Sequence, residues 1–111
     1  MNQDRLNELN QLVTEGIFVA ERAVDQNSPK AKEADREVSR LEEEIASLKP
    51  ASDLEGEIAR RGAVRAAMNA GDTRRAIDLA ATYIMEDCDK SAAILLVGLI
   101  IQGVSLKDRL T

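Results

Sequence analysis

The sequence predicts an all-α fold, in which an N-terminal antiparallel helical hairpin (coiled-coil-like, residues 1–50) precedes a three-helix unit over residues 51–111. Aromatic residues make up only 2% of the chain, whereas Ala, Leu, Ile, Glu and Arg, which lose little entropy in helices, dominate it. Apolar residues also recur at intervals of three and four, the period of one helix face. A chain of 111 residues can form one small core, part of which a partner could supply.

The first helix is expected over residues 3–25. Its apolar face repeats at helical spacing and comprises Leu6, Leu9, Val13, Ile17, Ala20 and Val24. A polar run that ends at Pro29 then interrupts the pattern. Asn27 or Ser28 is expected to cap the next helix, with Pro29 in its first turn, because the amide that proline lacks is unpaired at that position anyway. A tight chain reversal is therefore predicted.

A second helix is expected over residues 31–48. Its apolar residues alternate spacings of three and four and define a heptad seam made of Ala31, Ala34, Val38, Leu41, Ile45 and Leu48. The first helix, folding back through the short turn, is the nearest surface for this seam, although a third or fourth helix could also be needed to bury it. Glu42, Glu43 and Glu44 are predicted to lie on exposed helical surface. Pro50 ends the helix, because proline disfavours helical backbone in the residue before it.

The C-terminal unit begins with the pattern of a capping box, in which Ser52 and Glu55 would each satisfy a backbone amide of the other. This box predicts a third helix that runs to about Asn69. In the reversal that follows, Gly71 is expected to take a positive φ, which glycine adopts without steric cost. Asp72 is expected to cap the next helix.

Two further helices are expected, over residues 73–87 and from Asp89 or Ser91 to near Gly103. The apolar residues of the fourth helix are Ala76, Ile77, Leu79, Ala80, Tyr83 and Ile84. No charged side chain occurs over residues 92–104, so a solvated face there would expose an apolar patch that soluble monomers rarely tolerate. The N-terminal hairpin, a second copy of the chain or a bound helix could cover it. We therefore expect a partner-binding or self-association surface comprising Ile94, Leu95, Val97, Gly98, Ile101, Ile77, Ala80 and Ile84.

The composition argues against catalysis and cofactor binding. The chain has no histidine, which removes catalytic triads, histidine metal sites and the commonest general base. The single cysteine, Cys88, cannot form an internal disulfide and lacks the usual base of a thiol nucleophile. The six glycines show no phosphate-binding spacing. We expect no enzyme activity, no catalytic or metal-binding residue, no cofactor and no small-molecule substrate.

The net charge of −5 argues against nucleic-acid binding, which depends on Lys and Arg. The third helix, its turn and the fourth helix superficially resemble a helix-turn-helix. The arginines that could form a DNA-binding face there are Arg60, Arg61, Arg65, Arg74 and Arg75. We expect them to lie instead between solvent and acidic neighbours such as Glu57 and Asp78.

The sequence shows neither of the two segments that would direct the chain to a membrane or to secretion. No N-terminal segment combines a basic start with an apolar run, so no secretory signal is expected. The longest apolar run, residues 92–104, is well short of the roughly 20 residues that cross a bilayer. Together with the lone cysteine, which suits a reducing compartment, these observations predict a cytoplasmic protein without a membrane span.

The turn after the third helix resembles the turn inside a tetratricopeptide unit. Gly71 and Ala76 have the spacing of that unit's turn glycine and the alanine after it. Val97 and Gly98 stand where the next unit, one period of about 34 residues on, carries an apolar residue and a glycine in its first helix. The resemblance covers about residues 54–106 and implies a tetratricopeptide-like C-terminal unit.

Within that superfamily, residues 68–110 look similar to the chaperones that hold type III secretion needle subunits. Those chaperones work with a small helical-hairpin co-chaperone, and residues 1–50 here are expected to form a helical hairpin. Ala80 and Tyr83 depart from the repeat, which usually has a larger aromatic residue and an alanine at these places. The resemblance implies that a groove lined by the third to fifth helices shields an amphipathic helix of the partner.

We therefore expect a non-enzymatic protein-binding adaptor or chaperone that holds a helical partner. The alternatives are a homo-oligomeric coiled-coil structural protein and, third, a helix-turn-helix DNA-binding regulator. The packing of the heptad seam distinguishes the first two. Contacts between two copies of residues 38–48 would favour the oligomer, whereas contacts with residues 9–17 of the same chain would favour the adaptor.

Overall fold

The computed structural model describes residues 2–86 and Gly98, and residues 2–86 form four helices. These are α1 (Asn2–Asp25), α2 (Lys30–Leu48), α3 (Leu54–Asn69) and α4 (Thr73–Met85). This part of the chain contains no strand, so the predicted all-α class is confirmed. The expected fifth helix lies outside the described residues, except for Gly98, which is helical.

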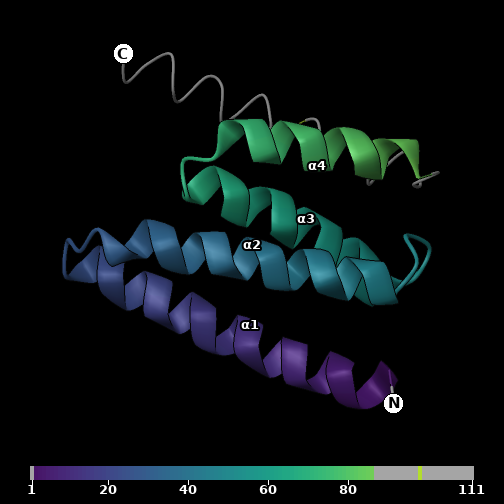
Figure 1. The fold of residues 1–111 in the computed structure, drawn as a ribbon, viewed down its shortest axis with the longest axis horizontal. Helices are drawn as coiled ribbons and strands as arrows, with labels where there is room; N and C mark the ends of the chain where they lie inside the picture. Colours follow the sequence, from purple (N-terminus) through teal and green to yellow (C-terminus); the bar gives the residue numbers. More distant parts are fainter. Residues whose placement is uncertain (1, 87–97, 99–111) are drawn as a thin grey trace.

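The four helices lie side by side in chain order (Figure 1). α1 and α3 run in one direction and α2 and α4 in the other, and within residues 2–86 each helix packs closely only on its neighbours in sequence. A single core runs through all three interfaces and consists of Leu6, Leu9, Val13, Val38, Ile45, Ala46, Ala59, Ala63, Val64, Ala66, Ala67, Ala76, Leu79, Ala80 and Tyr83. α2 is therefore flanked by α1 and α3 on two of its sides.

The contact face of α1 differs from the expected one. Its buried residues are Leu6, Leu9, Val13, Ala20 and Ala23. Ile17 and Val24, which the sequence pattern placed on this face, are 43% and 64% exposed, so that part of the prediction is wrong. α1 and α2 approach so closely that a Cβ on Gly16 would lie 2.7 Å from Val38 Cγ2. Glycine therefore occupies the close contact, and the larger Ile17 lies on the flank of the helix.

α2 has two contact faces, of which the sequence predicted one. The seam residues that join the core of the same chain are Val38, Leu41, Ile45 and Leu48. A second face, which includes the buried Ser39 and Ala46, packs on α3. Glu42 is half-buried between the two faces, so the prediction that it lies on exposed surface is wrong.

α1 and α3 end in the same kind of turn. Asn27 and Gly71 have positive φ angles of 56° and 78°, as predicted for the glycine. In the second turn the amides of Gly71 and Asp72 donate to the carbonyls of Met68 and Ala67, at 3.0 and 2.9 Å. The equivalent two bonds close the first turn at 2.9 and 2.7 Å. Such paired bonds define a Schellman motif, which satisfies carbonyls at a helix end.

The turn between α1 and α2 is stabilised by a serine. The hydroxyl of Ser28 accepts a hydrogen bond from the Lys30 amide at 3.2 Å, and Pro29 has helical backbone angles (φ −65°, ψ −12°) directly before α2. Ser28, rather than Asn27, therefore supplies the side-chain bond at the start of this helix.

Aspartates cap α3 and α4. The Asp53 carboxylate accepts from the amides of Glu55 and Gly56, at 2.9 and 3.4 Å. The prediction that Ser52 caps α3 is wrong by one position, because the helix begins one residue later. The Asp53 carboxylate also interacts favourably with the positive end of the helix dipole. Asp72 caps α4 as expected.

Candidate functional site

Apart from the helical Gly98, the described part of the expected binding surface lies on α4. Ile77 is 39% exposed, Ile84 is half-buried and Ala80 is buried in the core. Ile77 and Ile84 are one heptad apart and so share a flank of the helix. Outside the described residues lie Ile94, Leu95, Val97 and Ile101. The described chain therefore shows two isoleucines of this surface on one flank of α4.

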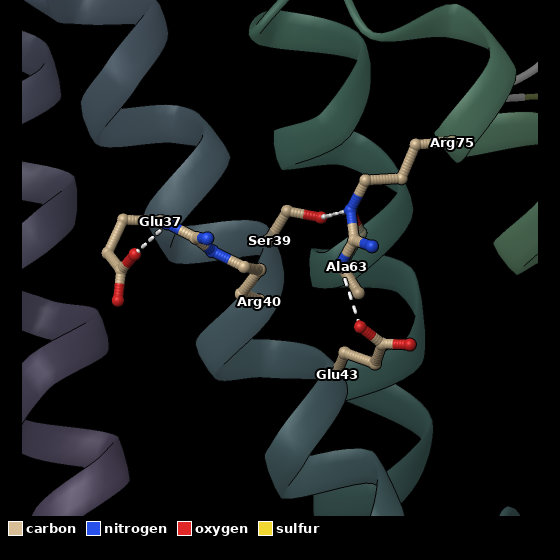
Figure 2. A network of polar contacts seen from close by, with 6 residues as sticks. All are labelled: Glu37, Ser39, Arg40, Glu43, Ala63 and Arg75. Atoms are coloured by element: carbon tan, nitrogen blue, oxygen red, sulfur yellow. Dashed lines mark hydrogen bonds and ion pairs between the residues drawn. The ribbon is translucent and has the colours of Figure 1, made fainter.

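A buried serine fixes the positions of α2, α3 and α4 (Figure 2). Ser39, which is fully buried, donates to the carbonyl of Ala63 at 2.8 Å and accepts from Arg75 Nε at 3.1 Å. Nη2 of the same guanidinium lies 2.8 Å from Oε1 of Glu43. Because α2 and α4 do not pack closely on each other, Arg75 links them by reaching across from α4.

Arg60 makes a second link, at the C-terminal ends of α2 and α4. Its Nη1 donates to the carbonyl of Lys49 at 2.9 Å, and its Nε and Nη2 lie 2.9 and 2.8 Å from Oε2 of Glu86. The guanidinium is 5.4 Å from the ring centroid of Tyr83, whose pKa burial raises to about 12. Arg60 is buried, contrary to the expectation that it lies near solvent, although it pairs with an acidic neighbour, Glu86.

The neighbouring arginines have the acidic partners that the sequence indicated. Nη2 of Arg61 lies 3.9 Å from a Glu57 oxygen, and Nε of Arg74 lies 3.5 Å from an Asp78 oxygen. Of the arginines considered for DNA contacts, Arg65 alone has no ion pair within the described residues. Most of this positive charge is therefore balanced within the chain.

A groove of about 480 Å³ opens between α1 and α3, with α2 as its floor. Its lining residues are Ile17, Ala20, Glu21, Asp35, Val38, Glu42, Ile58, Arg61, Gly62, Arg65, Ala66 and Asn69. Ile17 on one wall and Ile58 on the other are 43% and 50% exposed, although each belongs to a residue type that is usually buried. Each wall of the groove therefore presents an isoleucine that the described residues leave about half exposed.

Glu42 is the most unusual group in this groove. A Cβ on Gly62 would lie 2.9 to 3.1 Å from the carboxyl atoms of Glu42, so the carboxyl group rests against the backbone of α3. Burial raises the pKa of Glu42 to about 7 and also raises the pKa of Asp35. Within residues 2–86 no hydrogen bond or ion pair reaches the carboxyl group of Glu42. A partly buried carboxyl group without a counter-ion is costly when ionised.

Sequence reasoning missed this groove because it assigned α2 a single apolar seam. A weaker sequence signal for a second contact face on α2 was present. Ser39, Glu42 and Ala46 repeat at spacings of three and four beside the apolar seam, and two of them, Ser39 and Ala46, are small enough to let a second helix approach. Gly62, inside a predicted helix, likewise marks a place where another group lies against the backbone.

Comparisons with known proteins found no match for this chain. No family model matches it, and neither a curated protein nor a solved structure resembles it closely enough to count as a match. Among residues 2–86 and Gly98, no group of three or more acidic or cysteine side chains is placed to hold a metal ion. In the same residues no helix has both the length and the apolar character needed to cross a membrane.

Proposed function

We propose that this chain is a non-enzymatic protein-binding adaptor or chaperone, and that the groove between α1 and α3 holds a helix of its partner. The observation that carries the proposal is the pair Ile17 and Ile58, which line opposite walls of one groove and are about half exposed. Apolar surface of this kind, rimmed by charged residues, is typical of interaction sites.

A helix is the partner element that fits this site best. The groove lies between two helices that flank a third, which is the position the next helix of a bundle would take. An extended peptide would leave its backbone groups unpaired, because residues 2–86 contain no sheet edge on which it could form hydrogen bonds. Burying the exposed remainder of each isoleucine would contribute about 1 kcal/mol.

The alternative functions have less support. The α2 seam that a coiled-coil oligomer would use packs on α1 of the same chain. Most arginines that a DNA-binding regulator would need are paired with acids of the chain. The finer assignment, a chaperone of type III secretion needle subunits, rests on the resemblance of residues 68–110 and defines the first class of partner to look for.

Co-purification with groove variants tests the proposal. Tagged wild-type protein, Ile58→Asp and the control Phe18→Asp are expressed in the native cell, and bound proteins are quantified by mass spectrometry. Phe18 is 60% exposed but does not line the groove, so it provides a matched surface substitution. We expect Ile58→Asp to lose a partner that the wild type and Phe18→Asp both retain, with all three melting cooperatively by circular dichroism. A partner set unchanged by Ile58→Asp would contradict the proposal.

A further inference from the structure

We infer that the groove selects a helix with a lysine or arginine within its apolar stripe, and that Glu42 is the residue that recognises this cation. The inference rests on the proposed function and specifies the chemistry of the partner. It follows from the position of Glu42 on the floor of the groove, from the charges around it and from the absence of a counter-ion among the described residues.

The position of Glu42 directs its charge toward a docked helix. It lies on α2, half-buried, with its carboxyl group against Gly62 of one wall. Because burial raises its pKa to about 7, the carboxyl group is only partly ionised near neutral pH. A cation brought to the floor of the groove would stabilise the ionised form by a charge-assisted hydrogen bond in a site with little water.

The other charged groups of the groove do not neutralise Glu42. Asp35 on α2 and Glu21 on α1 add negative charge. Arg61 on α3 has Glu57 as its ion-pair partner, and Arg65 is exposed and makes no described ion pair. Among the described residues, the charged side chains on the floor and on the α1 wall are therefore all acidic, and the positively charged side chains lie on the α3 wall.

This charge pattern decides between possible occupants. Residues 92–104 of the same chain are apolar enough to enter the groove but contain no lysine or arginine, so they would leave Glu42 without a counter-ion. A helix with acids in its stripe would place like charges together. A partner helix that inserts one basic residue among apolar ones satisfies both the isoleucines and the carboxylate.

A displayed library of amphipathic helices, randomised along the apolar stripe, tests the inference. The library is sorted at pH 8 for binding to the wild-type protein and depleted of helices that bind Ile58→Asp. We expect the surviving helices to be enriched in Lys or Arg at one stripe position. One selected helix and its Lys→Met or Arg→Met variant are then titrated against wild type and Glu42→Gln, a near-isosteric substitution whose folding is checked by thermal melting.

Loss of the cation should weaken binding to the wild type by about tenfold and binding to Glu42→Gln by less than about twofold. Gly62→Ala would add a Cβ that displaces the Glu42 carboxyl group while leaving its charge. In this variant, loss of the cation from the helix should weaken binding by a smaller factor than it does in the wild type. Two results would overturn the inference and leave the proposed groove binding intact. One is enrichment of helices without a basic residue, and the other is an equal loss of affinity in wild type and Glu42→Gln when the basic residue is replaced by Met. Failure to enrich any helix on the wild type over Ile58→Asp would instead overturn the proposed function.

Discussion

At the scale of single residues, the buried Arg60 and the half-buried Glu42 differ in whether the described chain supplies partners for their charges. Arg60 is surrounded by acceptors, with two carbonyls and the Glu86 carboxylate at 2.8 to 2.9 Å. Glu42 has no such partners among residues 2–86. A paired charge of this kind supports the fold, whereas an unpaired one costs stability when ionised and so points to a role outside the folded chain.

The pKa of Glu42 predicts how stability depends on pH. Because this pKa is raised from 4.5 to about 7, the folded state binds a proton more tightly than the unfolded state. The resulting stabilisation is fully present below about pH 4.5 and is lost as the pH rises through 7. Glu42→Gln should remove this dependence and stabilise the protein at pH 8 by on the order of 1 to 2 kcal/mol, allowing for partial exposure.

Urea unfolding at pH 5.5 and pH 8 measures this difference. Glu33→Gln, an exposed substitution on the same helix, serves as the control and should leave the pH dependence of the wild type in place. A Glu42→Gln protein whose stability falls between the two pH values as steeply as that of the wild type would refute the assignment of the raised pKa to Glu42.

Arg60 should be the most important arginine for folding. Arg60→Ala removes the donors to Lys49 and Glu86 and the contact with Tyr83, so we expect a loss of about 2 to 3 kcal/mol in the free energy of unfolding. Arg74→Ala is the matched control, because the Arg74 side chain is 87% exposed. Its ion pair with Asp78 should contribute less than about 0.5 kcal/mol to the free energy of unfolding. Equal effects of the two substitutions in chemical denaturation would show that the Arg60 link is not structurally important.

At the scale of helices and turns, local signals in the sequence were sufficient for much of the fold. Proline, glycine and capping side chains predicted where the helices begin and end to within about two residues, because capping depends on short-range chemistry. The largest difference is at the end of α4, which was expected at residue 87 and lies at Met85. The pairing of α1 with α2 also follows from local pattern, since a short turn joins two apolar faces.

What the sequence could not supply was the geometry between neighbouring helices. Ile17 has the spacing of a core residue, but the close approach at Gly16 moves it to the flank and into the groove wall. Ser39 and Glu42 look like surface residues until α3 packs beside them. These positions depend on interhelical distance, which apolar periodicity does not encode.

The two Schellman turns provide a prediction at this scale. Gly71→Val should destabilise the protein by about 1 kcal/mol or more, because a β-branched residue fits poorly at a φ of 78°. Asn27→Gly, at the equivalent position of the other turn, should be neutral or slightly stabilising, because glycine is the residue most favoured there. Thermal melts of both variants measure the effect, and a Gly71→Val protein as stable as the wild type would rule out the strained turn.

At the scale of the whole molecule, the proposed function depends on helices that pack closely only on their neighbours in sequence within residues 2–86. Such an arrangement leaves α1 and α3 without close packing on each other, although Asn10 Nδ2 on α1 donates to Glu55 Oε2 on α3 at 3.0 Å. The space between the two helices is the groove. A bundle in which these two helices packed closely on each other would have no such site. The central claim is therefore that this space is occupied by a helix of another protein.

Site-specific photocrosslinking tests that claim most directly. A photoreactive phenylalanine analogue replaces Ile58 in the groove or, as the control, Phe18 outside it, and the protein is irradiated in its native cell. We predict a crosslinked product at position 58 and not at position 18, joined to a helical segment of one different protein. Crosslinks at position 58 only to copies of this chain, or equal crosslinking at both positions, would contradict the account.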